Sequence, residues 1–74
     1  MTDDDFLAEF VGATGAEPAN ITLDTPLKVS EFWDSVAYLT VMTLVDDRMG
    51  VVLDPDFVAD AETLREILER ARRS

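Results

Sequence analysis

Apolar side chains recur at helical spacing near the beginning of the chain. At about 100° per residue, four of them share one face: Phe6, Leu7, Phe10 and Val11. Three aspartates precede or overlap this face, and aspartate is favourable in the first turn of a helix. We therefore predict a helix over residues 3–13, with Thr2 and Asp5 in a capping box and with Gly12 and Gly15 weakening its end.

Residues 16–33 show no sustained period, and Pro18, Asn20 and Pro26 interrupt them. Such residues are typical of turns, so we predict a long first loop, in which Pro26 is also able to open a short helical turn. A long loop in a compact domain needs anchors. Its apolar residues can pin it onto the core: Ile21, Leu23, Leu27 and Phe32.

Residues 34–49 contain no glycine or proline and are rich in β-branched side chains, so a strand has to be weighed against a helix. The stretch is longer than a usual strand, and its pattern has the helical period. One side of the helix would carry Tyr38, Val41, Met42, Val45 and Met49. The other would carry Val36, Thr40, Thr43 and Asp47.

We therefore predict a second helix over Ser35–Met49, with Gly50 ending it. Asp34 would be the N-cap residue. Trp33 and Tyr38 would then occupy the two positions of a hydrophobic staple, although Trp33 could equally belong to a docking surface.

Two further helices complete the pattern. Asp54 followed by proline is typical of a helix start and predicts one short turn over residues 55–59. Asp60 would cap the last helix, whose inner stripe is Leu64, Ile67, Leu68 and Ala71. The expected fold is all-α: a single domain over residues 1–74, built as a small bundle of three main helices plus one short helix, with a long first loop.

Composition excludes several classes of function. The 74 residues include no cysteine and no histidine, so disulfides, zinc sites built on these ligands and the common general base and thiolate nucleophile are absent. We expect no metal site and no enzymatic activity. No apolar stretch approaches the roughly 18 residues of a membrane span, and the acidic start does not resemble a secretory signal. A monomeric cytoplasmic protein without a membrane partner is the expectation.

The formal net charge is −10, and it is unevenly spread. Residues 1–47 hold ten of the 16 acidic residues but only Lys28 among the six basic ones. Such a surface repels nucleic acid and attracts basic protein surfaces, although it is also the ordinary means of keeping a small protein soluble.

The residue that follows the cap, Ser35, has two interpretations. Asp34 and Ser35 are both common at helix starts and could serve only as capping residues. At the first helical position, however, the Ser35 hydroxyl would lie near free backbone N–H groups, which stabilise an attached phosphate. Asp46 lies within about 20° of Ser35 around the helix axis, and Asp47 lies on the polar side.

The sequence resembles the acyl carrier protein family. Asp34-Ser35-Val36 is similar to the family's Asp-Ser-Leu at the start of the second helix, and the upstream LDTPL is also similar. So are Asp46-Asp47 with the following Met-Gly-Val, and the late stretch AETLREIL. The similarity covers nearly the whole chain, in order and at the family's spacing.

The resemblance implies that Ser35 carries 4′-phosphopantetheine as a phosphodiester, installed by a phosphopantetheinyl transferase from coenzyme A. The arm's thiol would hold an acyl group as a thioester, in fatty-acid, polyketide or other specialised-metabolite biosynthesis. Asp34 would help the transferase to recognise the site, and Val36 would be the adjacent apolar contact. The inner faces of the later helices would admit part of an acyl chain, through Leu39, Met42, Val45 and Leu64.

The partner surface implied by the resemblance contains Asp46 and Asp47, with Thr40 and Thr43 on the same helix. These residues would meet basic docking patches on acyl-loading, synthase or acyltransferase enzymes. Thr40 stands where the family often has an acid, and Phe32-Trp33 stands where it commonly has glycine. These departures weaken the expected recognition by fatty-acid synthesis enzymes, so a specialised pathway is at least an equal alternative. The alternative is an unmodified acidic helical adaptor that binds basic protein surfaces.

Overall fold

Helices account for all the regular structure in the computed structural model, which describes residues 2–73. In chain order the elements are α1 (Asp3–Thr14), the 3₁₀ turn η1 (Pro18–Asn20), α2 (Ser35–Met49), α3 (Pro55–Asp60) and α4 (Leu64–Arg73). No strand occurs within those residues. The expected all-α bundle of three longer helices and one short helix is confirmed. Over the same residues, no helix has the length and apolar character needed to cross a bilayer.

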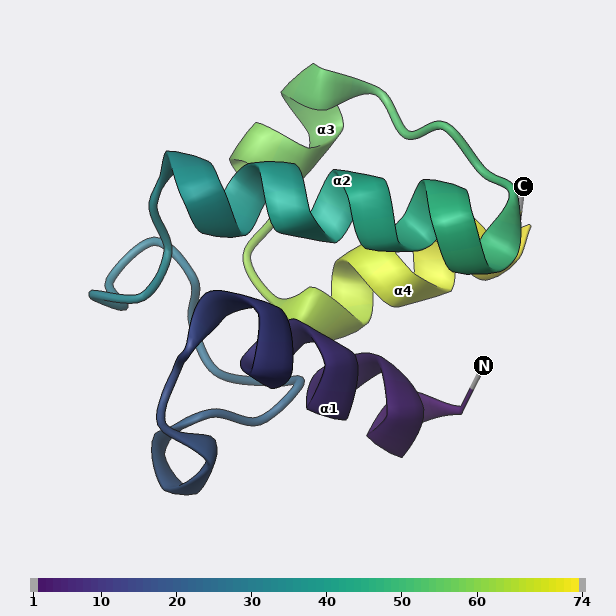
Figure 1. Cartoon of the computed structure of the whole chain (residues 1–74). Coiled ribbons are helices and arrows are strands. Elements are labelled where there is room, and N and C mark those ends of the chain that lie inside the picture. Colours follow the sequence, from purple (N-terminus) through teal and green to yellow (C-terminus); the bar gives the residue numbers. More distant parts are fainter. Residues whose placement is uncertain (1, 74) are drawn as a thin grey trace.

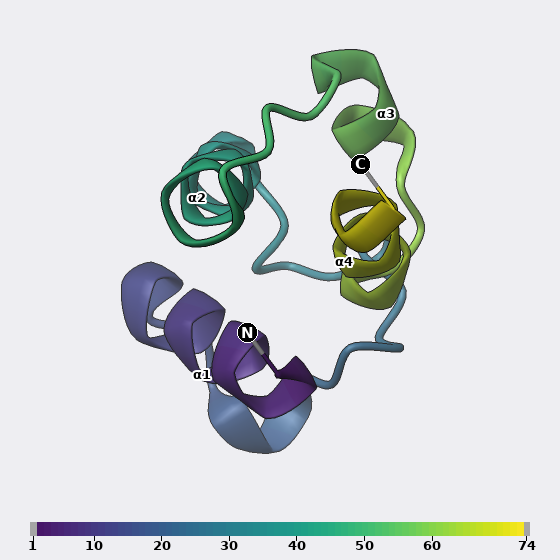
Figure 2. The ribbon, with the colours of Figure 1, turned by 90° about the vertical axis from the view of Figure 1, so that its right-hand side faces the viewer.

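The hydrophobic core lies between the helices, with α2 in contact with α1, α3 and α4. Figure 1 shows α2 between α3 and α1, and the turned view in Figure 2 shows α1 and α2 on one side of the bundle and α3 with α4 on the other. The apolar faces supply fully buried side chains: Phe6 and Phe10 from α1, Val41 and Val45 from α2, Val58 from α3, and Leu64, Ile67 and Leu68 from α4. Each such burial stabilises the fold by about 1.5–3 kcal/mol.

The start of α1 has one of the two hydrogen bonds of the predicted capping box. The Thr2 hydroxyl accepts a hydrogen bond from the Asp5 N–H at 3.1 Å, which satisfies one free donor of the first turn. At the other end Gly15 has a left-handed backbone with φ of 72°, and its N–H donates to the Val11 carbonyl. Gly12 does not weaken the helix enough to end it, so α1 extends one residue beyond the prediction.

The long first loop is anchored as expected. Ile21, Leu23 and Leu27 are buried. Phe32 packs edge-to-face against Phe10, with ring centroids 6.0 Å apart and planes at 74°. Pro26, however, opens no helix: the chain makes only a turn there, in which the Ser30 N–H donates to the Leu27 carbonyl.

The start of α4 differs from the prediction. Asp60 is the last residue of α3, and α4 begins only at Leu64. The cap is Thr63, whose hydroxyl accepts from the Glu66 N–H at 3.2 Å. Ala61 does not begin the helix, because its backbone is extended, with ψ of 140°. The Leu27 N–H donates to the Glu62 carbonyl at 2.8 Å, which ties this segment to the first loop. The four residues of the predicted inner stripe are all buried.

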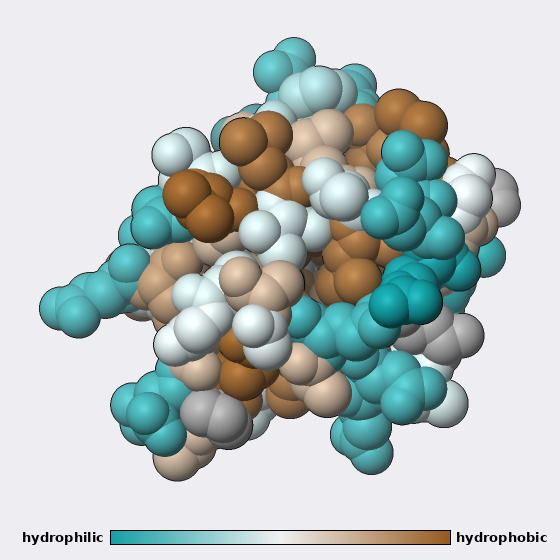
Figure 3. All heavy atoms as spheres, in the orientation of Figure 1, coloured by the Kyte–Doolittle hydropathy of each residue, from teal (hydrophilic) through white to brown (hydrophobic). Residues whose placement is uncertain are grey.

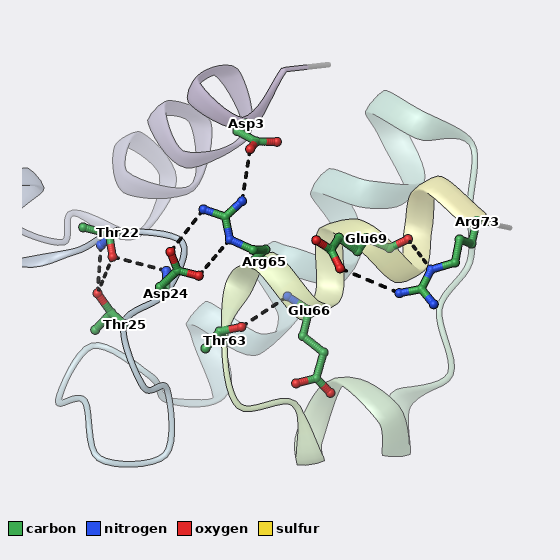
Figure 4. Close-up of polar contacts among 9 residues, drawn as sticks. All are labelled: Asp3, Thr22, Asp24, Thr25, Thr63, Arg65, Glu66, Glu69 and Arg73. Carbon is green, nitrogen blue, oxygen red and sulfur yellow. Dashed lines mark hydrogen bonds and ion pairs between the residues drawn. The ribbon is translucent and has the colours of Figure 1, made fainter.

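A second backbone bond joins the same two segments, from the Arg65 N–H to the Leu23 carbonyl at 3.0 Å. The Arg65 guanidinium also pairs with Asp24 of the loop and with Asp3 at the start of α1 (Figure 4). Backbone and side-chain bonds therefore hold residues 23–27 of the loop against α4 and the segment before it.

Candidate functional site

The N-terminus of α2 is built by a side-chain cap. Asp34 has an extended backbone, and its carboxylate accepts from the Ala37 N–H at 2.9 Å. Its carbonyl accepts from the Tyr38 N–H, which is the first hydrogen bond of the helix. Asp34 is thus the N-cap, and α2 has the predicted bounds, with Gly50 as its left-handed C-cap.

Ser35 occupies the first position of α2 and is exposed. Its hydroxyl makes no hydrogen bond to any other residue of the 2–73 segment, and neither do the N–H groups of Ser35 and Val36. The cap role belongs to Asp34 alone, so capping does not account for the serine. The arrangement presents a free hydroxyl beside free backbone donors at the positive end of a fifteen-residue helix.

The two staple positions flank this end. Trp33 and Tyr38 are half-buried and pack against the hydrophobic core. The Tyr38 hydroxyl donates to the Pro55 carbonyl at 3.1 Å, which links the first turn of α2 to the start of α3. Contacts with the core and with α3 therefore hold residues on both sides of Ser35 in place.

Two hollows lie on either side of the site. The first, of about 450 Å³, is lined by the end of α1, the loop and the start of α2, including Glu17, Glu31 and Asp34. The second, of about 420 Å³, runs over α2 and is lined mainly by apolar side chains: Ala13, Val36, Leu39, Thr40, Thr43, Leu44 and Asp47. Val36 borders both hollows. Figure 3 shows hydrophobic atoms at the surface over α2.

The residues of the predicted partner surface lie on the outside of α2. Thr43, Asp46 and Asp47 are exposed, and Thr40 is half-buried with its hydroxyl donating to the Val36 carbonyl. Neither aspartate forms an ion pair within the described part of the chain. The neighbouring cation Arg48 pairs instead with Glu9 of α1 at 2.6 Å, so their negative charge is left facing solvent.

The four residues predicted to receive an acyl chain do not share one face. Val45 and Leu64 are fully buried, and Met42 is partly buried against the core. Leu39 is 59% exposed and lies on the outer side of α2, which corrects its assignment to an inner face. The physical reason is the helical period: Leu39 is about 160° around the axis from the buried Val41. Sequence reasoning also missed the groove that Leu39 helps to line, although the spacing of Val36, Leu39 and Thr43 indicates one outward face.

Comparison with known families settles the class of the protein. Residues 4–71 match the family model described as a phosphopantetheine attachment site. The chain belongs to this family. Searches among curated proteins and among solved structures found no match. The chain is therefore a carrier domain of the acyl carrier protein type, and its cofactor is covalently attached 4′-phosphopantetheine. Domains of this kind are non-catalytic and interact with a phosphopantetheinyl transferase and with biosynthetic enzymes.

The residues at the start of α2 fit this prosthetic group. Attachment through a phosphodiester needs an accessible hydroxyl, and the Ser35 hydroxyl is exposed and unbonded among the described residues. The attached phosphate would lie beside the free N–H groups of Ser35 and Val36, where a helix terminus favours an anion. The carboxylate of Asp34 opposes that phosphate, but it is directed to the Ala37 N–H.

Proposed function

We propose that Ser35 is the residue that carries 4′-phosphopantetheine, and that this carrier domain presents acyl intermediates to enzymes of fatty-acid, polyketide or other specialised-metabolite biosynthesis. The observation that carries the proposal is the exposed, unbonded hydroxyl of Ser35 at the first position of α2 within the described chain. Ser30, by contrast, has its hydroxyl engaged with the Pro26 carbonyl. The protein acts as a monomer in the cytoplasm.

The chemistry follows from the hydroxyl. With a magnesium-dependent transferase, the Ser35 oxygen forms a new bond to the phosphorus next to pantetheine in coenzyme A. The bond from that phosphorus to the nucleotide breaks, so adenosine 3′,5′-bisphosphate leaves and the hydroxyl proton passes to a base of the transferase. When bound, the group supplies a thiol, which forms thioesters. The chain has no thiol of its own, because it contains no cysteine.

Each neighbouring residue has a role in this proposal. Asp34 fixes the start of α2 through the Ala37 N–H and marks the site for the transferase. Val36, which is 63% exposed, supplies an apolar contact beside the hydroxyl. Asp46 and Asp47, with Thr40 and Thr43, form the surface that basic docking patches meet. Met42, Val45 and Leu64 would receive an acyl chain only after the closed core opened between α2 and α4.

The test is modification followed by intact-mass measurement. The protein is incubated with coenzyme A, magnesium and a broad-specificity phosphopantetheinyl transferase. We expect one added phosphopantetheine in the native protein and in Ser30→Ala, and none in Ser35→Ala. The absence of any gain with several transferases would contradict the proposal and favour the acidic adaptor, whose only support is the unpaired acidic surface of α2.

A further inference from the structure

Apart from Val36, the residues of the groove over α2 have no role in the attachment reaction proposed for Ser35. Apart from Ala13 of α1, its residues follow one another along α2 from Val36 to Asp47, a distance of about 16.5 Å at 1.5 Å per residue. Val36 and Leu39 are 63% and 59% exposed, and a large apolar side chain left in water is unfavourable. The groove begins at the residue next to Ser35, so a chain tethered there reaches it without crossing another element.

The side chains that the structure describes between α2 and α4 are shielded from solvent. Val45, Leu64 and Ile67 are completely buried, and Leu68 is 1% exposed. An acyl or pantetheine chain that entered between α2 and α4 would have to displace these side chains, and close-packed protein interiors resist displacement. The outer groove is already open.

The lining also suits the chemistry of the arm. Pantetheine alternates apolar segments, including a carbon with two methyl groups, with amides. Val36, Leu39 and Leu44 provide apolar contacts for the former. Thr43 is exposed, and its hydroxyl is available to an amide. The Thr40 hydroxyl donates to the Val36 carbonyl but retains lone pairs that accept from an amide N–H.

We propose that the phosphopantetheine arm tethered at Ser35 rests in this groove, along the outer face of α2 toward Asp47, between encounters with enzymes. The inference rests on the proposed attachment at Ser35. In this inference Val36, Leu39 and Leu44 make the apolar contacts with the arm, and Thr43 makes a polar contact with it. The reactive end of the arm then lies near the exposed Asp46 and Asp47, on the surface that partners are proposed to meet.

The experiment compares unmodified and modified protein by nuclear magnetic resonance, with isotope-labelled protein and an unlabelled arm. Residues 34–37 will change signal on modification wherever the arm lies, so they are not diagnostic. We expect shifts at the amides of Leu39, Thr43, Leu44 and Asp47, and isotope-filtered contacts between the arm's methyl protons and the methyl groups of Leu39 and Leu44. Shifts confined to residues 34–37 would overturn the assignment, because the arm would then make no contact along the groove. Shifts at Met42, Met49 and Phe57 instead would also overturn it, because these residues pack against the core and do not line the groove.

A variant pair sharpens the result. Leu39→Asp places a charge in the groove, whereas Val52→Asp places one on a residue that is 81% exposed in the α2–α3 connection. In the modified Leu39→Asp protein the shifts at Thr43 and Leu44 should be lost, and in Val52→Asp they should persist. Intact mass, measured first, separates the two proposals: failure to gain the arm counts against Ser35, and a gain without groove contacts counts against the resting site alone.

Discussion

Arg65 holds Asp24 at two points across 41 positions of sequence: Nε lies 2.7 Å from Oδ1, and the second guanidinium nitrogen lies 3.1 Å from Oδ2 (Figure 4). The same arginine contacts Asp3 of α1 at 3.3 Å. One side chain therefore joins the start of α1, the first loop and the start of α4. The three side chains are 41–67% exposed, so the pair is worth little in free energy at high salt. Its structural effect is to tie the first loop to α1 and α4.

The ion pair predicts a pH dependence of stability. The Arg65 hydrogen bond, aided by its charge, lowers the pKa of Asp24 below its ordinary value. A carboxyl group whose folded pKa is depressed stabilises the fold above its unfolded pKa, and this stabilisation is lost as pH falls through the folded pKa. We expect Asp24→Asn to be less stable than the native protein at pH 7, and the difference to disappear in acid. Urea unfolding at a series of pH values measures this difference in the free energy of unfolding.

Asp60→Asn is the matched control for this experiment. Asp60 is exposed and forms no ion pair with any residue that the structure describes. Its variant should show no such pH-dependent gap. If Asp24→Asn and Asp60→Asn gave parallel curves, the Arg65 contact would have no role in stability.

The bounds of α2 were predictable because its signals are local. Asp34, the unbroken apolar pattern and Gly50 all lie within the element they delimit, and each agrees with the others. The start of α4 was not predictable in this way. Asp60 and Thr63 are both good capping residues. The segment between them has an extended backbone at Ala61 and is bonded to the first loop through the Leu27 N–H and the Glu62 carbonyl, a contact between distant segments that no local pattern reports.

This choice gives a second prediction. Thr63→Ala removes the acceptor for the Glu66 N–H and should cost about 1 kcal/mol in free energy of unfolding. Asp60→Ala should cost less, because Asp60 ends α3 and caps nothing. Denaturant unfolding of the two variants measures which of them loses more free energy of unfolding. A larger loss in Asp60→Ala would restore the capping role that its position in the sequence suggests.

Gly12 inside α1 and Gly15 at its C-cap give a third prediction, because replacing each by alanine should change stability in opposite directions. A Cβ at Gly12 would meet nothing within 4 Å, and the residue lies inside the helix, so Gly12→Ala should stabilise the protein by about 0.5–1 kcal/mol. Gly15 has φ of 72°, so Gly15→Ala should destabilise it by roughly 1 kcal/mol or more. Thermal unfolding of both variants tests the pair. Equal shifts of the same sign would show that backbone conformation is not what separates them.

The candidate site was predictable to the extent that the helical period applies. The period places Ser35, Thr43, Asp46 and Asp47 outside, and the structure agrees. Leu39 was wrongly grouped with the inner residues because that assignment followed the family resemblance and not the helical period, which places Leu39 about 160° from the buried Val41. The groove itself requires Ala13 of α1 beside α2, and no local pattern reports how closely two helices approach.

The acidic end of α2 gives the last prediction. Asp46 and Asp47 lie at a helix C-terminus, where the dipole disfavours negative charge by a few tenths of a kcal/mol each. Replacing both by lysine should therefore leave helicity unchanged or slightly improved. Binding to a phosphopantetheinyl transferase with a basic docking face should fall by about tenfold at low salt, since opposed charges accelerate association and like charges prevent it.

The control for this variant changes the net charge by the same amount elsewhere. Asp60, at the end of α3, and Glu62, in the α3–α4 connection, are both exposed. Lysine at both positions makes the same change in net charge and leaves Asp46 and Asp47 in place. Calorimetric titration of each double variant, with circular dichroism to verify the fold, separates the cases. An equal loss of binding in both variants would mean that the transferase responds to net charge. A loss of helicity at 46 and 47 would mean that the pair is structural. A loss of binding confined to those two positions, which diminishes as salt is added, is the outcome that a docking surface beside Ser35 requires.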